Sequence, residues 1–442
     1  MGFFKQTIFR KAFSLFFLLF LASHAGAQRY LADIDTAFIK DTVRPFLKKF
    51  ENIRITGYMQ PQFQIVSADG ASTYGGGNFS AFSKSRFMLR RARLKVDYLL
   101  QSAHHFPQGL FTFQVDATER GVIVRDMFIR IFETKNNNLS LTTGFFARPF
   151  GFEVNLGSSY RESPERGRMS QILMPGERDL GAMVSFEPQD KNNKYFHLKL
   201  DAGFFNGQGA SGTTDFDSHK DFITRFSVKP YSIGKAELSV GLSLLLGGWK
   251  NGTKYVYSSG VSSGGEQVFI VDSAAANLGK SSPRHYYGSD FQIRFKHRKG
   301  ETELRAEHWF GTQPGTANST TNPGSLPNSN GTPLPTYVRH FNGGFFYILQ
   351  HIGSTRHQLI LKYDWYDPNI RVKGTQIGKA GTNLNASDIS YSTFGFGYTY
   401  YMNSQTKLIL YYDLVSNENT LITGATNDQK DNLFTARLQF RF

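Results

Sequence analysis

From Arg54 to Phe442 this chain divides into segments of about ten residues in which polar and apolar side chains alternate, with turn residues between the segments. Within one such segment, Leu94 and Val96 fall on one face of a strand, while Arg93 and Lys95 fall on the other. Alternation with a period of two indicates β-strands that have two different faces. Such strands suit either a soluble sandwich with an apolar core or a membrane barrel whose apolar faces contact lipid.

The alternating segments predict about sixteen strands, and bacterial barrels built from one chain have an even number of strands. The predicted strands cover residues 53–66, 84–100, 109–118, 122–133, 138–147, 180–188, 194–205, 219–229, 235–249, 285–298, 301–311, 337–350, 356–369, 387–402, 405–415 and 432–442.

The lengths of the connections favour a barrel over a sandwich. Links after even-numbered strands are mostly short, such as 229–232 and 403–404, whereas links after odd-numbered strands are mostly long, such as 148–179 and 250–284. The exception is the tight link 119–121 on the long-loop side. A sandwich would scatter loop lengths between its two ends. We therefore predict an all-β fold, a transmembrane antiparallel β-barrel over residues 53–442 with short periplasmic turns and long extracellular loops.

Composition agrees with this fold. The chain has 42 Phe, 21 Tyr and 43 Gly, which suits strands that expose apolar side chains and turn tightly between them. It has no cysteine, so in an oxidising compartment it must close its structure without disulfides, as a barrel does by backbone pairing. After the N-terminal region, no segment approaches the 18 apolar residues of a membrane helix.

The two ends of the chain carry export signals. Basic residues up to Lys11, the apolar run 12–22 and the small residues 25–27 predict that residues 1–27 are a signal peptide. Residues 28–52 are then a periplasmic N-terminal lead-in, too short for a plug domain. The amphipathic last strand ends at Phe442, which resembles the signal read by the barrel-assembly machinery. We predict the outer membrane of a Gram-negative bacterium as the location, with outer-membrane lipid around the barrel.

The formal charge of +15 points to acidic partners. The leader carries three basic and no acidic residues, so the mature chain keeps an excess of +12. A secretory leader argues against nucleic acid as the partner. Small anionic solutes are therefore the predicted partners.

A series of short motifs carries a resemblance to a known family. In chain order they are Ile55-Thr56-Gly57-Tyr58-Met59-Gln60-Pro61-Gln62-Phe63, Arg90-Arg91-Ala92-Arg93-Leu94, Phe113-Gln114-Val115-Asp116, Asp126-Met127-Phe128-Ile129, Gly144-Phe145-Phe146-Ala147-Arg148-Pro149-Phe150-Gly151-Phe152-Glu153 and Glu177-Arg178-Asp179-Leu180-Gly181.

Together these motifs resemble the phosphate-selective porin O and P family, with the best match over residues 53–190. The resemblance implies a sixteen-stranded, trimeric, anion-selective porin whose third extracellular loop folds inward and narrows the pore. In this chain that loop is 148–179. It lacks a dense lysine cluster. We therefore predict a porin for passive diffusion of small anions, a class that includes phosphate and polyphosphate, and not a strictly phosphate-selective porin.

The candidate solute contacts are basic residues of the third long loop and of the polar strand faces. Guanidinium groups donate a fork of hydrogen bonds to phosphate or carboxylate, and rings of Arg and Lys select anions in pores. An alternative stays open, since loop glutamates, Asp97 and Asp116 can instead pair with these bases and hold the wall rigid. The predicted anion-binding or pore-lining residues are Arg91, Arg93, Lys95, Arg130, Arg148, Arg161, Arg166, Arg168, Arg178 and Arg294.

Three other functions fit the sequence less well. The first is an outer-membrane enzyme, but this chain offers no convincing nucleophile to partner His308 or His340. We therefore predict no catalytic residue, metal or cofactor. A gated transporter needs about 22 strands and a plug, which this length cannot supply. A general or sugar-permeable porin stays open as the main alternative, because the loops contain many tyrosines.

Overall fold

The computed structural model describes residues 52–101, 107–212 and 214–442. The predicted signal peptide (1–27) and the predicted lead-in (28–52), apart from Asn52, lie outside the described residues.

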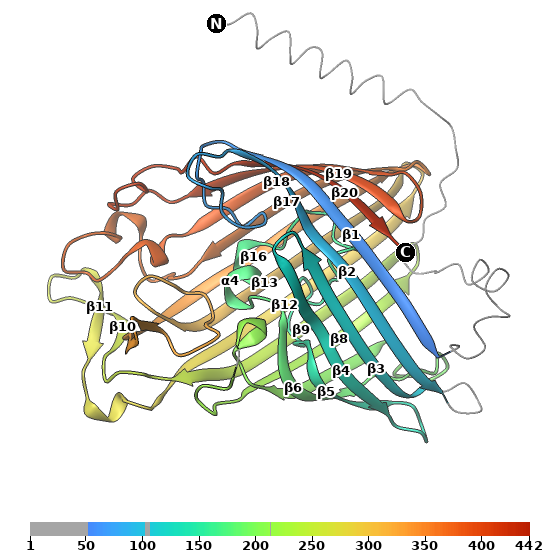
Figure 1. Cartoon of the computed structure of the whole chain (residues 1–442), viewed down its shortest axis with the longest axis horizontal. Helices are drawn as coiled ribbons and strands as arrows, with labels where there is room; N and C mark the ends of the chain where they lie inside the picture. The colour runs from blue at the N-terminus through green and yellow to red at the C-terminus, as the bar shows by residue number, and fades with distance from the viewer. Residues whose placement is uncertain (1–51, 102–106, 213) are drawn as a thin grey trace, which may run out of the picture.

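Sixteen antiparallel strands form the closed wall of a β-barrel (Figure 1), which confirms the predicted fold and strand number. The barrel closes where β1 pairs with β20, with Met59 opposite Phe440 and Phe63 opposite Ala436. The wall strands are β1 (Ile53–Val66), β2 (Ser85–Gln101), β3 (Pro107–Thr118), β4 (Gly121–Phe132), β5 (Leu139–Ala147), β6 (Arg178–Phe186), β7 (Leu198–Phe205), β8 (Asp221–Ile233), β9 (Ala236–Lys250), β12 (Ser281–His297), β13 (Gly300–Gly315), β16 (Thr336–Ile352), β17 (His357–Asp367), β18 (Tyr391–Tyr401), β19 (Thr406–Asn417) and β20 (Leu433–Arg441).

The outer face of the wall carries an apolar band. In one row around it, Phe291 lies opposite Ala306, Ala306 opposite Phe346, and Phe346 opposite Tyr363. The aromatic members of this row are exposed, whereas Asp290, next to Phe291 in the chain, is buried on the inner face. Because neighbouring strands share this alternation, the outer surface suits lipid and the inner surface holds the charges. These strands show the alternation of polar and apolar faces that the sequence predicts.

The connections divide into a short-turn end and a long-loop end (Figure 1). The predicted turn at 229–232 is wrong, because β8 continues to Ile233 and the chain reverses at Gly234, whose φ is +61°. The pairing of β8 with β9 skips from Val228 to Tyr231, so Pro230 lies in a bulge. Proline has no backbone N–H to donate to the ladder, and a bulge tolerates it within a strand.

The long-loop end has more structure than the sequence predicted. Within the predicted loop 250–284, β10 (Val256–Val261) and β11 (Gln267–Asp272) form a hairpin, and β10 also pairs in parallel with β16. Phe269 of this hairpin packs with Tyr337 and with apolar residues of the two last long loops. Smaller elements here are β14 (Asn328–Ser329), β15 (Thr332–Pro333), η2 (Gly209–Ser211), η3 (Ala275–Asn277), η4 (Gly374–Gln376) and η5 (Ala386–Asp388).

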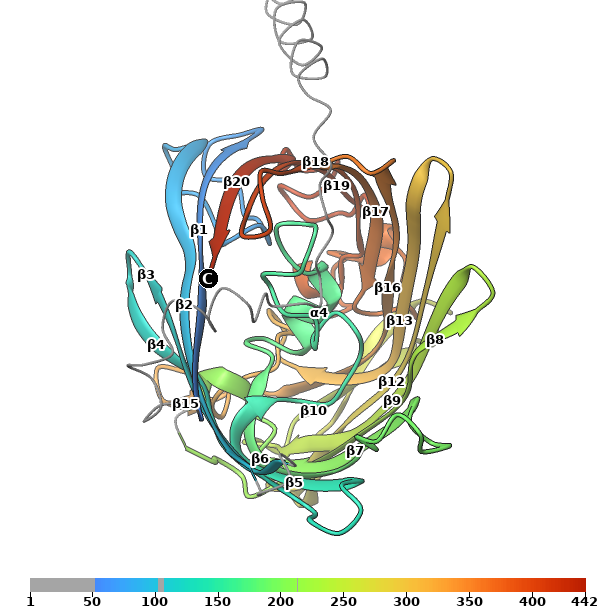
Figure 2. The ribbon, with the colours of Figure 1, turned by 90° about the vertical axis from the view of Figure 1, so that its right-hand side faces the viewer.

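The connection between β5 and β6, residues 148–177, is called the inner loop here. It contains the six-residue helix α4 (Arg168–Leu173), and a view along the barrel shows α4 inside the ring of strands (Figure 2). None of the helices within the described residues has the length and apolar character to span a membrane.

Candidate functional site

The inner loop contacts wall strands far from its own ends. The Ser158 hydroxyl hydrogen-bonds that of Tyr58 on β1 at 2.5 Å, and the Ser163 hydroxyl that of Tyr347 on β16 at 2.6 Å. The Lys407 ammonium on β19 donates to the carbonyl of Arg161 at 3.1 Å. The loop therefore crosses the lumen and narrows it.

Apolar packing holds the loop inside the barrel. Phe150 meets the edge of Trp309 with ring centroids 4.7 Å apart, and both side chains are fully buried. Burying a large apolar side chain is worth about 1.5–3 kcal/mol. Gly151, which follows Phe150 in the chain, has φ +66°. A Cβ there would lie 2.1 Å from a Glu307 carboxylate oxygen, so only glycine fits. The same cluster includes Phe146, Val154, Met169, Ile172, Leu173, Met174, Met183, Phe205, Ile223, Leu245, Tyr286, Phe341 and Tyr366.

The tip of the loop places Glu165 among three arginines of the wall. Arg91 donates to both carboxylate oxygens at 3.0 and 2.6 Å, Arg90 donates at 2.8 and 3.1 Å, and Arg437 donates at 2.8 Å. Burial acts to raise the pKa of Glu165, but these guanidiniums together hold the pKa well below its usual range. Glu165 is therefore a charged anchor that ties the loop to β2 and β20.

At the base of the loop, Glu177 serves four arginines. Its carboxylate lies 2.9 Å from Arg166 and 3.9 Å from Arg161, and it also bonds Arg125 and Arg178. Burial raises and the arginines lower the pKa of Glu177, which ends well below its usual range. Glu177 has φ +65°, a left-handed conformation that costs a non-glycine residue energy. The surrounding ion pairs keep the carboxylate in place despite this cost.

These contacts form what we call the arginine cluster. Arg93 pairs with Asp116 at 2.8 Å and Arg178 pairs with Asp126 at 2.9 Å. Within it, buried guanidinium nitrogens of Arg161 and Arg125 have no hydrogen-bond partner among the described residues. Its members are Arg90, Arg91, Arg93, Arg125, Arg161, Arg166, Arg178 and Arg437, with the carboxylates of Asp116, Asp126, Glu165 and Glu177.

Eight guanidiniums thus meet four carboxylates, so the cluster has a formal excess of positive charge. Buried N–H donors without partners are costly to a folded protein, at about 1–3 kcal/mol for each unsatisfied group. A small anion beside the cluster would add negative charge where the guanidiniums are in excess. The arrangement is suited to attract anions without enclosing them.

Other predicted site residues lie outside this cluster. Lys95 pairs with Asp97 at 2.9 Å, and Arg130 donates to the Thr142 hydroxyl at 2.8 Å without a carboxylate partner among the described residues. Arg294 lies 3.5 Å from each of Glu237, Glu301 and Glu303.

Two further predicted anion-binding residues, Arg148 and Arg168, belong to the inner loop but not to the arginine cluster. The buried Arg148 donates to the Pro175 carbonyl at 3.5 Å, and its Nε has no partner among the described residues. Arg168 lies between two tyrosine rings beside the loop.

Arg90 and Arg125 are missing from the predicted set because strand bulges bring them inward. The pairing of β1 with β2 shifts at Gln60, and that of β3 with β4 shifts at Gln114. Each shift turns two neighbouring charged residues to the same side. The doublets Arg90-Arg91 and Arg125-Asp126 were a usable signal, since strict alternation would put one charge of each in lipid at a cost of about 2–4 kcal/mol.

Within the described residues, no group of His, Asp and Glu side chains is arranged to hold a metal ion. No protein-family model matches the sequence, and no curated protein matches it either. Among solved structures, the chain is similar to an anion-selective porin from Comamonas acidovorans. The two share 11% sequence identity over 88% of this chain and 99% of that chain, with a TM-score of 0.53. The barrel has the porin fold.

A second solved structure of the same fold is the outer membrane channel DcaP of Acinetobacter baumannii. It has 12% identity over 88% of this chain and 97% of that chain, with a TM-score of 0.50. At this identity the likeness concerns the fold alone. The resemblance to the phosphate-selective porin O and P family stays a prediction.

Proposed function

We propose that this chain is an outer-membrane porin through which small anions diffuse passively. The observation that carries the proposal is the arginine cluster, where guanidiniums outnumber carboxylates at the place where the inner loop crosses the lumen. Fixed positive charge in a narrow passage lowers the energy of an anion there and raises that of a cation. Since several arginines share the excess, binding is spread over several groups and the anion can leave.

Bases nearer the short-turn end extend this path, and we call them the vestibule bases. Arg130 has no carboxylate partner among the described residues. Lys199 and Lys229 lie 3.2 and 3.6 Å from Glu187, and Lys199 also lies 3.5 Å from Asp201. Lys95 is also one of them and keeps 34% of its side chain exposed. Arg294 is not one of them, because the carboxylates of Glu237, Glu301 and Glu303 outnumber it. Exposed bases of this kind raise the local anion concentration over roughly a Debye length, about 8 Å at physiological salt.

The apolar outer band supports a place in the outer membrane of a Gram-negative bacterium, with the short-turn end in the periplasm and the long loops outside. In the same proposal, residues 1–27 are the signal peptide, Phe442 is read by the barrel-assembly machinery, and three copies form a trimer. The trimer rests on the family resemblance. The chain is not proposed to be an enzyme.

A general or sugar-permeable pore is the second candidate. It is favoured by tyrosines that remain exposed near the lumen, Tyr74 and Tyr160, because aromatic rings stack on sugars. Phosphate is the finer possibility within the anion class, since guanidinium forks match its oxygens.

The flux of labelled ions tests this proposal. Liposomes that contain the mature chain should pass radiolabelled chloride faster than radiolabelled rubidium, and liposomes without protein should pass neither. Excess phosphate should slow chloride if phosphate occupies the arginine cluster. Uptake of an uncharged disaccharide at the chloride rate would favour the general pore, and faster rubidium flux would refute anion preference.

A further inference from the structure

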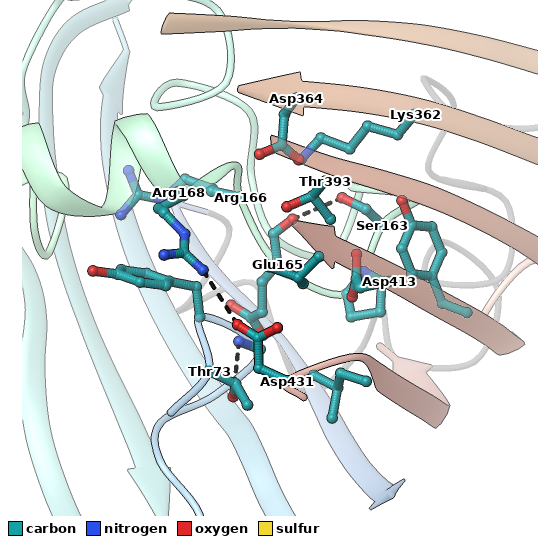
Figure 3. Close-up of a pocket in the computed structure, with 16 residues that line it drawn as sticks. Thr73, Ser163, Glu165, Arg166, Arg168, Lys362, Asp364, Thr393, Asp413 and Asp431 are labelled. Carbon is teal, nitrogen blue, oxygen red and sulfur yellow. Dashed lines mark hydrogen bonds and ion pairs between the residues drawn. The ribbon is translucent and has the colours of Figure 1, made fainter. Parts of the chain in front are cut away.

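A cavity borders the arginine cluster at Glu165 and Arg166 and lies between the inner loop, the wall and two of the long loops (Figure 3). Its volume is about 50 Å³, and four parts of the chain line it. They are the loop between β1 and β2 at residues 73–75, the inner loop at 163–168, strands β17 to β19, and residues 431–433. This volume admits a few water-sized groups, so any ligand must be small.

One side of the cavity offers hydrogen-bond donors. The Arg168 guanidinium lies 3.5 Å from the ring centre of Tyr391 and 4.6 Å from that of Tyr74, so two aromatic faces hold it. Its nearest carboxylate is Asp431 at 3.8 Å, and it makes no hydrogen bond to another described residue. A planar guanidinium fixed in this way is ready to donate to a carboxylate.

The other side offers acceptors. The Asp413 carboxylate has no hydrogen bond or ion pair within 4 Å among the described residues, although the Lys362 ammonium, which also lines the cavity, acts on its charge from farther away. The Tyr411 hydroxyl and Asp431 Oδ1 are buried and lack partners as well, although only 2% and 6% of these residues is exposed. The Tyr411 ring packs on Gly395 and Gly397, where a Cβ would lie 2.1 and 2.4 Å from it, so the ring is held in position.

We propose that this cavity binds a small zwitterionic α-amino acid, with the carboxylate at Arg168 and the ammonium group at Asp413 and Tyr411. A simple anion would meet Arg168 but also the negative charges of Asp413 and Asp431. A simple cation would meet the opposite conflict. A ligand with both charges satisfies both sides, and its three ammonium hydrogens supply the donors that the acceptors lack.

This inference rests on the proposed pore only in that the ligand reaches the cavity from the long-loop end. Binding itself can be measured without transport. Equilibrium dialysis of radiolabelled glycine against the detergent-solubilised mature chain should show saturable binding with one site per chain. Acetate and methylammonium each carry only one of the two charges. Each should therefore compete with glycine at least roughly tenfold more weakly than unlabelled glycine does.

Substitutions separate the two sides of the cavity. Asp413→Asn and Arg168→Gln should each weaken glycine binding by roughly tenfold or more, because each removes one charge that the zwitterion needs. Asp69→Asn and Arg371→Gln make the same charge changes at exposed loop positions and should leave binding unchanged. Tyr411→Phe keeps the ring and should weaken glycine binding by a smaller factor. If Asp413→Asn fails to fold, this variant still tests the acceptor side of the cavity.

Three results would overturn the inference: no saturable glycine binding, competition by acetate as strong as that by glycine, or competition by methylammonium as strong as that by glycine. The second would show an anion site and the third a cation site. Loss of glycine binding with chloride preference intact refutes this inference alone. Cation preference with glycine binding intact refutes the proposed function alone.

Discussion

Arg91 and Lys95 lie on the same inner face of β2, yet their surroundings differ. Arg91 is buried, with 8% of its side chain exposed, and donates two hydrogen bonds to Glu165 of the inner loop. Lys95 has 34% of its side chain exposed and pairs only with Asp97 of its own strand. The first belongs to the arginine cluster and the second to the vestibule bases. Alternation along a strand sets which face a residue occupies, but the loop decides how deeply it is buried.

The comparison separates two roles of positive charge. In the arginine cluster, removing one partner leaves other charges buried without compensation, which costs about 3–5 kcal/mol. Among the vestibule bases, solvent screens each charge, and an exposed pair is worth about 0–1 kcal/mol. In the proposed pore we therefore expect the cluster to contribute to both stability and selectivity, and the vestibule bases to contribute to selectivity alone.

The largest expected effect is on stability. Glu177→Gln removes the carboxylate that four buried arginines share, and we expect a loss of about 3–5 kcal/mol in the free energy of unfolding. Urea unfolding of the vesicle-inserted barrel, followed by tryptophan fluorescence, measures it. Glu266→Gln is the matched control, since its side chain is 46% exposed and pairs with Lys379. A similar small effect for both variants would break the comparison.

The next effect concerns selectivity at the loop tip. Glu165→Gln keeps the size of the side chain but removes one negative charge from among Arg90, Arg91 and Arg437. One unit charge at about 4 Å is worth on the order of 1 kcal/mol in water and acts with opposite sign on chloride and potassium, so the chloride-to-potassium permeability ratio should rise by roughly thirtyfold. Bilayer recordings measure this ratio. Glu119→Gln, at the exposed β3–β4 link, should leave it unchanged. An unchanged ratio in both would mean that the cluster does not face the ion path.

A smaller shift is expected from the vestibule bases. The double variant Lys95→Glu/Arg130→Glu should move permeability toward cations by roughly twofold, because screening weakens charges in a wide region. Its free energy of unfolding should stay within about 1 kcal/mol of the parent. Loss of the folded barrel in this variant would show that these bases are structural after all.

The smallest effect is a pH dependence at Asp431. Burial raises the pKa of this carboxyl to about 6, against the opposing influence of Arg168. Below pH 6 Asp431 becomes neutral and Arg168 keeps its charge, so anion preference should rise slightly as the pH falls from 8 to 5. The folded chain holds this proton more tightly than the unfolded chain, so the contribution of Asp431 to stability falls as pH rises through about 4 to 6. Asp431→Asn should remove the contribution of this carboxyl to both trends.

Sequence reasoning could predict the wall of the barrel and several arginines of the lumen, but not the contacts that join them. The strand number and the faces of residues such as Phe291 and Asp290 follow from alternation, which repeats in every segment. The bulges beside Gln60 and Gln114 break that period, so Arg90 and Arg125 were missed. The pairing of Glu165 with Arg437 joins residues 272 positions apart, and no local pattern encodes such a contact.

The reversal potential in a steep KCl gradient tests the central claim most directly, that the arginine cluster gives this barrel an excess of positive charge along its ion path. With the mature chain in a planar bilayer, we predict a reversal potential of the sign set by chloride, shifted further in that direction by Glu165→Gln. A reversal potential of the sign set by potassium would contradict the account.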